Sequence, residues 1–204
     1  MKLFYNIAYL IGFTPWEHAA THLPAARHIT SLFEEEERGR RPPYGRVLDL
    51  GCGRGYWALV LAQRGWSVTG VELVPKAARA ARERLSKAGV EAVIVQGDVT
   101  DLRSDEIGSE FRLVWDFGTI HGLTQEERRA VGRGVSELTT DDATILMVAW
   151  APGRRGPFPR GVSRREVEEA FVGWNVTDEQ PFDVTGLPKP LQKVGPRVYR
   201  LNRV

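Results

Sequence analysis

The chain has 204 residues, of which 42% are hydrophobic and 26% charged, and its formal net charge is +2. This length and composition suit one soluble domain with a sizeable core. Because both signs of charge are spread along the sequence, there is little electrostatic case for a nucleic-acid partner, which usually binds a dense basic patch. The single cysteine excludes an internal disulfide.

The first 44 residues are predicted to form a helical segment ahead of the core. Their apolar run 3–13 is too short to span a bilayer, and only Lys2 precedes it as a basic residue, so it makes a poor signal sequence. Thr14 and Glu17 have the spacing of a capping box, with Pro15 at the first helical position, which indicates the start of a folded helix. We therefore expect a cytoplasmic protein without a membrane segment.

The rest of this N-terminal segment offers no ligand chemistry. His18 and His22 share a face of the predicted helix, but no cysteine or glutamate lies at a spacing that would complete a metal site, so no metal is expected. The acidic run Glu34–Glu37 is predicted to be a solvated helix end, and the segment 40–45, which contains two prolines and a glycine, to be a linker.

From residue 45 onward, apolar runs alternate with helical patterns. Strands are predicted near 46–51, 66–72, 91–97, 111–116 and 143–150, and helices near 55–64, 75–88 and 124–138. Such βαβ alternation indicates a parallel sheet with helices on both faces.

The C-terminal part has a different pattern. Ser163 and Glu166 have capping-box spacing and open a predicted helix that runs to about Phe171. Two β-type runs follow, 173–182 and 196–203, and their connection is too short for a crossover helix, so an antiparallel hairpin is predicted. The whole pattern predicts an α/β fold: a Rossmann-like, seven-stranded mixed sheet with helices on both faces and a C-terminal antiparallel hairpin.

A glycine-rich turn follows the first predicted strand. Gly51, Gly53 and Gly55 let the backbone turn sharply and come close to a ligand. The dinucleotide fingerprint would place its last glycine one position later, where this chain has Tyr56. Asp49, at the end of the strand, would repel a pyrophosphate but suits a ligand with an ammonium group, such as S-adenosylmethionine (SAM).

Two further acids follow the next two strands. Glu72 ends the second strand, where its two carboxylate oxygens can accept both hydroxyls of a ribose. Asp98 ends the third, where it can accept from an adenine amino group, while the Val99 N–H donates to a ring nitrogen. Cys52, inside the glycine turn, is interpreted as a small buried residue of the cofactor site and not as a nucleophile.

The motifs VLDLGCGRG, VTGVEL and VIVQGDV, in this order, resemble those of the class I SAM-dependent methyltransferases. The resemblance runs from about residue 45 to the C-terminus, and it implies a single domain over 1–204, with an N-terminal helical lid segment (1–44) and a Rossmann-like core (45–204). It also implies SAM as cofactor and S-adenosylhomocysteine as product, with Leu73 packed on the adenine. The SAM-contacting positions that it implies are Asp49, Gly51, Gly53, Glu72 and Asp98.

The loop after the fourth strand is the second candidate for chemistry. Asp116, Gly118 and His121 fall beyond the carboxyl end of this strand, where open α/β sheets bind ligands. Asp116 and His121 are candidate bases for an acceptor that must lose a proton. Asp116 is also a candidate cofactor contact, and His121 could equally be a helix-entry histidine bonded to backbone.

The pattern D-x-G-x-x-H-x-L resembles the thiopurine-methyltransferase-like and TehB-like small-molecule branch, although Phe117 replaces a residue that is usually basic or polar there. The branch carries a Pro-Trp pair that lids the cofactor, which implies that role for Trp16. Together with Trp150 and Phe158, Trp16 is a candidate for an aromatic acceptor pocket beside His121.

The function predicted from these residues is transfer of a methyl group from SAM to an O, N or S atom of a small, aromatic or heterocyclic molecule. A nucleic-acid or protein methyltransferase is the alternative, but Asp116-Phe117-Gly118 stands where a base-holding Asn-Pro-Pro-Tyr loop would be. A non-catalytic SAM-binding protein is the third possibility, and it would need neither Asp116 nor His121. The oligomeric state is left open.

Overall fold

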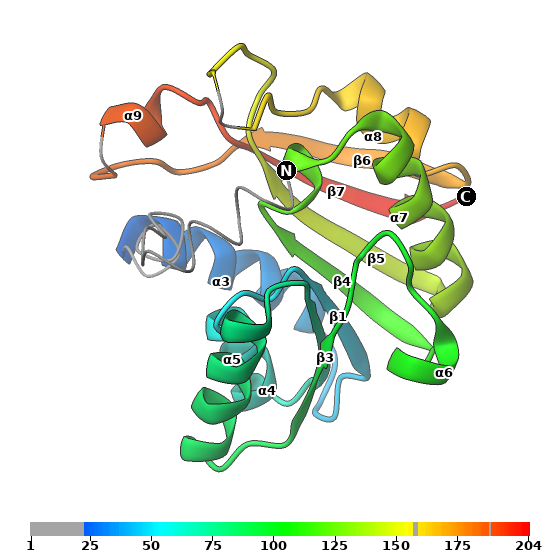
Figure 1. The fold of residues 1–204 in the computed structure, drawn as a ribbon. Coiled ribbons are helices and arrows are strands. Elements are labelled where there is room, and N and C mark those ends of the chain that lie inside the picture. Colours follow the sequence, from blue (N-terminus) through cyan, green and yellow to red (C-terminus); the bar gives the residue numbers. More distant parts are fainter. Residues whose placement is uncertain (1–22, 157–158, 188) are drawn as a thin grey trace.

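The computed structural model describes residues 23–156, 159–187 and 189–204. Within these residues, seven strands form one sheet in the order β3-β2-β1-β4-β5-β7-β6, and the helices cover both of its faces (Figure 1). The strands are β1 (Arg46–Leu50), β2 (Ser67–Glu72), β3 (Ala92–Gln96), β4 (Phe111–Phe117), β5 (Thr139–Ala149), β6 (Trp174–Pro181) and β7 (Arg197–Arg203). The helices are α3 (Leu23–Glu37), α4 (Tyr56–Arg64), α5 (Pro75–Lys87), α6 (Ser104–Ile107), the 3-10 turn η1 (Ile120–Gly122), α7 (Gln125–Leu138), α8 (Arg164–Ala170) and α9 (Lys189–Gln192).

The sheet is mixed, as the sequence predicts. Strands β1 to β5 are parallel, and β7 lies antiparallel between β5 and β6. Because β6 therefore runs in the same direction as β5, the chain that connects β6 to β7 lies at the carboxyl ends of the parallel strands. The predicted C-terminal hairpin is confirmed, and its connection, residues 182–196, comes back to the edge of the sheet where such folds bind ligands.

The core is divided between the two faces by the alternation of each strand. On β4, Leu113 and Trp115 belong to the cluster under α3, α4 and α5, whereas Val114 points into the cluster under α7 and α8. Figure 1 shows these helix groups on opposite sides of the sheet. Both faces of the central strands are thus dry, which explains why their sequences are nearly continuous apolar runs.

Strand β5 begins earlier than the sequence predicts, at Thr139 instead of residue 143. Its first residues are polar and give no apolar alternation, so only pairing with β4 defines them. The short helices α6, η1 and α9 were also not predicted. Each has three or four residues, too few to show a helical period.

Helix α3 is part of the core, and the prediction of a solvated acidic end is wrong for two of its four glutamates. Glu37 accepts hydrogen bonds from Arg64 Nε (2.7 Å) and Trp66 Nε1 (3.0 Å). Glu36 is buried and pairs with Arg200 of β7. These pairs fasten α3 to α4 and β7. The part of the predicted lid that precedes Leu23, including Trp16, lies outside the described residues.

Among the residues that the structure describes, no helix is both long and apolar enough to cross a membrane.

Candidate active site

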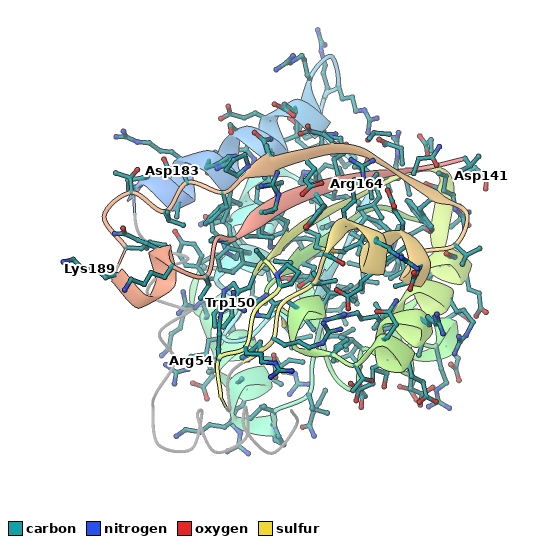
Figure 2. The ribbon with its side chains drawn as sticks, turned by 90° about the horizontal axis from the view of Figure 1, so that it is seen from above. Arg54, Asp141, Trp150, Arg164, Asp183 and Lys189 are labelled. Atoms are coloured by element: carbon teal, nitrogen blue, oxygen red, sulfur yellow. The ribbon has the colours of Figure 1, made fainter. Side chains whose placement is uncertain are left out.

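The predicted site residues that the structure describes gather at the carboxyl ends of the parallel strands. Figure 2 shows Arg54 of the glycine turn and Trp150 after β5 on the same side of the molecule as Asp183 and Lys189. Asp141, near the start of β5, lies at the opposite end. The turns after β1, β4, β5 and β6 therefore face one region, in the position expected for ligand binding in an open α/β sheet.

The glycine turn has the backbone that its sequence predicts. Gly51, Gly53 and Gly55 have φ angles of 65°, 55° and 73°, in the left-handed region that favours glycine. A Cβ on Gly51 would lie 2.1 Å from Oγ1 of Thr119, whose hydroxyl donates to the Leu50 carbonyl at 2.9 Å. The turn after β1 and the turn after β4 are thus in direct contact.

Glu72 anchors the glycine turn. Its Oε2 accepts from the Gly53 N–H at 2.9 Å, and its Oε1 accepts from the Val74 N–H at 2.7 Å. The side chain is buried, so these contacts replace its lost hydration. A carboxylate oxygen has two lone pairs, so it can accept more than one hydrogen bond.

Asp49 is the one acid of this site with an oxygen that lacks a partner in the described structure. Its side chain is 2% exposed, and Oδ2 has no hydrogen-bond partner among the described residues. Burial raises its pKa well above the usual range, and the nearby Asp116 and Glu72 raise it further. A buried, unpaired carboxylate beside two other acids is costly unless a cation binds to it.

The turn after β3 carries Asp98 and Val99, which are predicted to bind adenine. Asp98 Oδ1 accepts from the Thr100 N–H at 3.0 Å and from the Thr100 hydroxyl at 2.8 Å, which fixes the side chain in a tight turn. Val99 is buried and Leu73, after β2, is partly exposed. The structure therefore brings these three residues to the same edge as Glu72, as predicted.

Cys52 is a buried residue of the glycine turn. A Cβ on Gly70 would lie 2.8 Å from its Sγ, so the sulfur fills the space that this glycine of β2 leaves open. Burial raises the pKa of the thiol well above the usual range, with Asp49 and Glu72 contributing. A thiol of this kind is a poor nucleophile at neutral pH.

Asp116 holds the turn after β4. Its Oδ1 accepts from the Thr119 N–H at 2.7 Å and its Oδ2 from the Ile120 N–H at 2.9 Å. Burial raises the pKa of Asp116 to about 6, while these two hydrogen bonds oppose the rise. Both oxygens are therefore used by the backbone of the loop that carries His121.

His121 lies flat against Trp150. The ring centroids are 4.7 Å apart at an interplanar angle of 19°, and the Trp150 N–H donates to Nδ1 of His121 at 3.2 Å. Gly118 leaves room for the imidazole, since a Cβ there would lie 3.2 Å from its Cε1. Burial, followed by the charges of Arg128 and Arg155, lowers the pKa of His121 to about 3. The ring is thus neutral at physiological pH.

Stability should depend on pH through His121. The pKa of His121 is about 3 in the folded protein and near its ordinary value of 6.5 in the unfolded chain, so the unfolded chain binds more protons between these values. The free energy of unfolding should then fall by up to about 1.4 kcal/mol per pH unit as pH drops below about 6.5.

Urea titrations between pH 7 and pH 4, on the wild type and on His121→Asn, would measure this effect. Asparagine keeps an acceptor for the Trp150 N–H but does not titrate. The raised pKa values of Asp49 and Asp116 act with the opposite sign and are common to both proteins. Parallel curves for the two proteins would contradict the prediction.

Sequence reasoning missed two sets of residues near the site. Arg128 of α7 is fully buried and bonds to both acceptor-side loops. Phe117 and Phe182 form an edge-to-face pair at 6.0 Å, and Phe182 stacks on His28 of α3 at 5.3 Å. A lone arginine in an amphipathic helix and isolated aromatics carry no signal of such contacts in a sequence. Trp16 and Phe158, which were predicted to line the acceptor pocket, lie outside the described residues.

The fold is similar to that of known methyltransferases. The structure is similar to a crystal structure of a SAM-dependent methyltransferase from Clostridium acetobutylicum, with a TM-score of 0.71, 13% identity and 98% of each chain covered. It is also similar to a TehB-like SAM-dependent methyltransferase from Corynebacterium glutamicum, with a TM-score of 0.67, 21% identity and 98% of each chain covered. At these identities the likeness shows the fold, which is that of the α/β methyltransferases.

Part of the chain matches a known family model. Residues 47–142 match the methyltransferase domain family. A curated relative, 2-heptyl-1-hydroxyquinolin-4(1H)-one methyltransferase from Mycobacteroides abscessus, is 28% identical over 145 residues, which cover 68% of this chain and 62% of the relative. The chain therefore spans less than two thirds of that relative's length. The sequence match is thus to the methyltransferase domain over residues 47–142, and the fold is that of the α/β methyltransferases.

The residues of the site fit the cofactor of this class. The unpartnered Oδ2 of Asp49 needs a cationic donor, and the ammonium group of SAM is one. The left-handed glycines leave the backbone of the turn free of Cβ atoms. Among the described residues, no three His, Cys, Asp or Glu side chains come together as a metal site.

Proposed function

We propose that the protein transfers the methyl group of SAM to an O, N or S atom of a small, flat aromatic or heterocyclic molecule. The observation that carries this proposal is the stack of Trp150 on His121 beyond the ends of β4 and β5. Trp150 is partly exposed on the side of the sheet where the glycine turn lies (Figure 2), and the Arg155 guanidinium lies over its ring, 5.7 Å from the centroid. Aromatic faces favour flat apolar ligands and attract a nearby sulfonium.

The cofactor contacts belong to the same proposal. Asp49 would bind the ammonium group, Glu72 the ribose hydroxyls, and Asp98 the adenine amino group. Leu73 would pack on the adenine, and the Val99 N–H would donate to it. Each of these side chains already lies at the edge where the cofactor binds in this class.

The acceptor side is apolar. The Phe117 ring stacks on Trp115 at 6.0 Å and meets the edge of Phe182 at 6.0 Å. Phe117 is partly exposed, so this aromatic column reaches the surface at the end of β4. The absence of a charge at position 117 supports a neutral, flat acceptor. The heterocyclic compound in the name of the relative from Mycobacteroides abscessus is of this kind.

SAM supplies an electrophilic methyl group, and the acceptor residues need to hold the attacking atom in line with it. Asp116 and His121 were predicted as bases, and their hydrogen bonds favour a positioning role for both. Both oxygens of Asp116 accept from backbone, and Nδ1 of His121 accepts from Trp150. With a pKa of about 3, His121 is a weak base at neutral pH. An acceptor whose own O–H or S–H group ionises readily would need no base.

The pH dependence of kcat tests the positioning role. With SAM saturating and two acceptors whose pKa values differ by about two units, the rise of kcat with pH should move with the acceptor. His121→Asn should leave the position of each rise unchanged. A rise fixed at one pH for both acceptors, and lost in His121→Asn or Asp116→Asn, would restore the base assignment.

The function itself is tested by a product screen. The protein is incubated with SAM and a panel of hydroxyquinolones, phenols, thiols and N-heterocycles, and S-adenosylhomocysteine is measured. We expect turnover of flat hydroxylated heterocycles, and a rise in the acceptor KM for Trp150→Ala but not for Trp174→Ala, which changes a tryptophan at the opposite end of the sheet. Turnover of RNA or protein alone would overturn the acceptor class, and tight SAM binding without any turnover would support a non-catalytic protein.

A further inference from the structure

A fully buried arginine of α7 contacts the loops that follow β4 and β5. Arg128 is on α7, and its guanidinium donates from Nε to the Ile120 carbonyl at 3.0 Å and from Nη2 to the Gly161 carbonyl at 2.8 Å. Its Nη1 lies 3.3 Å from Glu166 Oε1, which balances the charge. Ile120 belongs to the turn after β4 and Gly161 to the loop after β5, so one side chain joins both loops.

The bonds of Arg128 close a ring of contacts around Trp150. Next to Ile120, His121 accepts the Trp150 N–H through Nδ1 at 3.2 Å. On the other side, the Trp150 carbonyl accepts from the Val162 N–H at 2.9 Å, and Val162 follows Gly161 directly. The ring therefore runs from Arg128 through the turn after β4, across Trp150, and back to Arg128 through the loop after β5.

We propose that Arg128 is a positioning residue for the acceptor: by holding the carbonyls of Ile120 and Gly161 it keeps Trp150 stacked on His121. This inference rests on the proposed function in one respect, namely that Trp150 and His121 face the acceptor.

Joining the two loops requires a side chain with two separate donor nitrogens, which the guanidinium of Arg128 provides. Two carbonyls from different loops accept from two different nitrogens of Arg128, at an angle fixed by the planar group. The Ile120 peptide is held from both sides, because its N–H donates to Asp116 Oδ2. A lysine at position 128 would keep the charge but offer a single nitrogen, which cannot reach both carbonyls in this geometry.

The effect should be confined to the acceptor side of the site. The bonds of Arg128 go to η1, the loop after β5, α7 and α8, and the cofactor acids Glu72 and Asp98 lie on β2 and after β3. If Arg128 were purely structural, replacing it would lower stability and weaken the binding of acceptor and cofactor equally. If it positions the acceptor, replacing it should raise the acceptor KM and leave the affinity for the cofactor unchanged.

Arg128→Lys tests the proposal, with Arg129→Lys as the matched control. Arg129 is the next residue of α7, is half-exposed, and lies 4.0 Å from Glu169. Three quantities are measured: the KM for 2-heptyl-1-hydroxyquinolin-4(1H)-one, the Kd of S-adenosylhomocysteine by calorimetry, and the imidazole NMR signals of His121, assigned with His121→Asn. In Arg128→Lys we expect the acceptor KM to rise about tenfold, because small misplacements of a bound reactant are costly. The Kd should stay within about twofold, and the His121 signals should lose the ring-current shift from Trp150.

Equal increases in the acceptor KM and in the Kd of S-adenosylhomocysteine, or unchanged His121 signals, would overturn the proposal. If no acceptor is turned over, the proposed function fails, but the His121 signals still test the positioning claim. If Arg128→Lys does not fold, the Nε–H resonance of Arg128 in the wild type decides. This resonance should shift when the quinolone is added to the complex with S-adenosylhomocysteine. A resonance that does not shift would rule out a link between Arg128 and the acceptor.

Discussion

Replacing Glu72 by alanine should abolish the rise in melting temperature that S-adenosylhomocysteine gives the wild-type protein. Glu72 is the acid that ends β2; it holds the glycine turn at Gly53, and it is proposed to bind the ribose hydroxyls. Loss of two hydrogen bonds to a charged group, each about 1.5–3 kcal/mol, raises Kd by roughly 100-fold or more. Differential scanning fluorimetry and calorimetry measure both quantities.

Two further variants serve as controls for the loss of binding in Glu72→Ala. Glu72→Gln keeps the shape of the side chain and one acceptor oxygen, so an intermediate Kd is expected. Glu83→Ala removes an exposed glutamate of α5 and should bind like the wild type. A full rise in melting temperature for Glu72→Ala would disprove the ribose assignment.

Asp49→Asn should have two effects of opposite sign. The apo protein should become more stable above neutral pH, because the variant removes a buried carboxylate that Asp116 and Glu72 repel. The affinity for S-adenosylhomocysteine should fall by about 2 kcal/mol, roughly 30-fold, because the ammonium group loses its charged partner. Asp101→Asn, at an exposed position, is the control.

The sign of the pH effect follows from the raised pKa of Asp49. A carboxyl with a raised pKa binds its proton more tightly in the folded state, so its contribution to stability is lost as pH rises through the folded value. Binding of an ammonium group reverses the shift and releases a proton. Calorimetry in buffers of different ionisation enthalpy should detect this proton for the wild type and not for Asp49→Asn. Equal proton release by both would contradict the assignment.

The cofactor half of the site could be predicted from sequence because its signals are local. A buried strand, three glycines and an acid at the end of the next strand are neighbours along the chain, and the parallel sheet brings their ends together. Asp49, Glu72 and Asp98 reach one edge of the sheet for this reason. The C-terminal hairpin was predictable as well, from a connection too short for a crossover helix.

The acceptor half depends on contacts between distant residues. Trp150 and His121 are 29 positions apart, and only the structure shows their stack and hydrogen bond. The prediction of His121 as a base does not allow for its burial, which lowers its pKa to about 3. Glu37 was predicted to lie in solvent because its partners are distant in sequence: Arg64 lies on α4 and Trp66 just before β2. Sequence patterns do not encode such pairings.

The strand order separates the two ligands along the chain. Among the described residues, those proposed to bind the cofactor lie between Asp49 and Val99, whereas those proposed for the acceptor begin at Asp116, and the antiparallel β7 returns the 182–196 connection to the same edge. The two halves meet at the seam between β1 and β4, where Thr119 touches Leu50, and also where α3 contacts β7 and Phe182. Acceptor preference can therefore diverge through residues after Asp116 while the cofactor half stays unchanged.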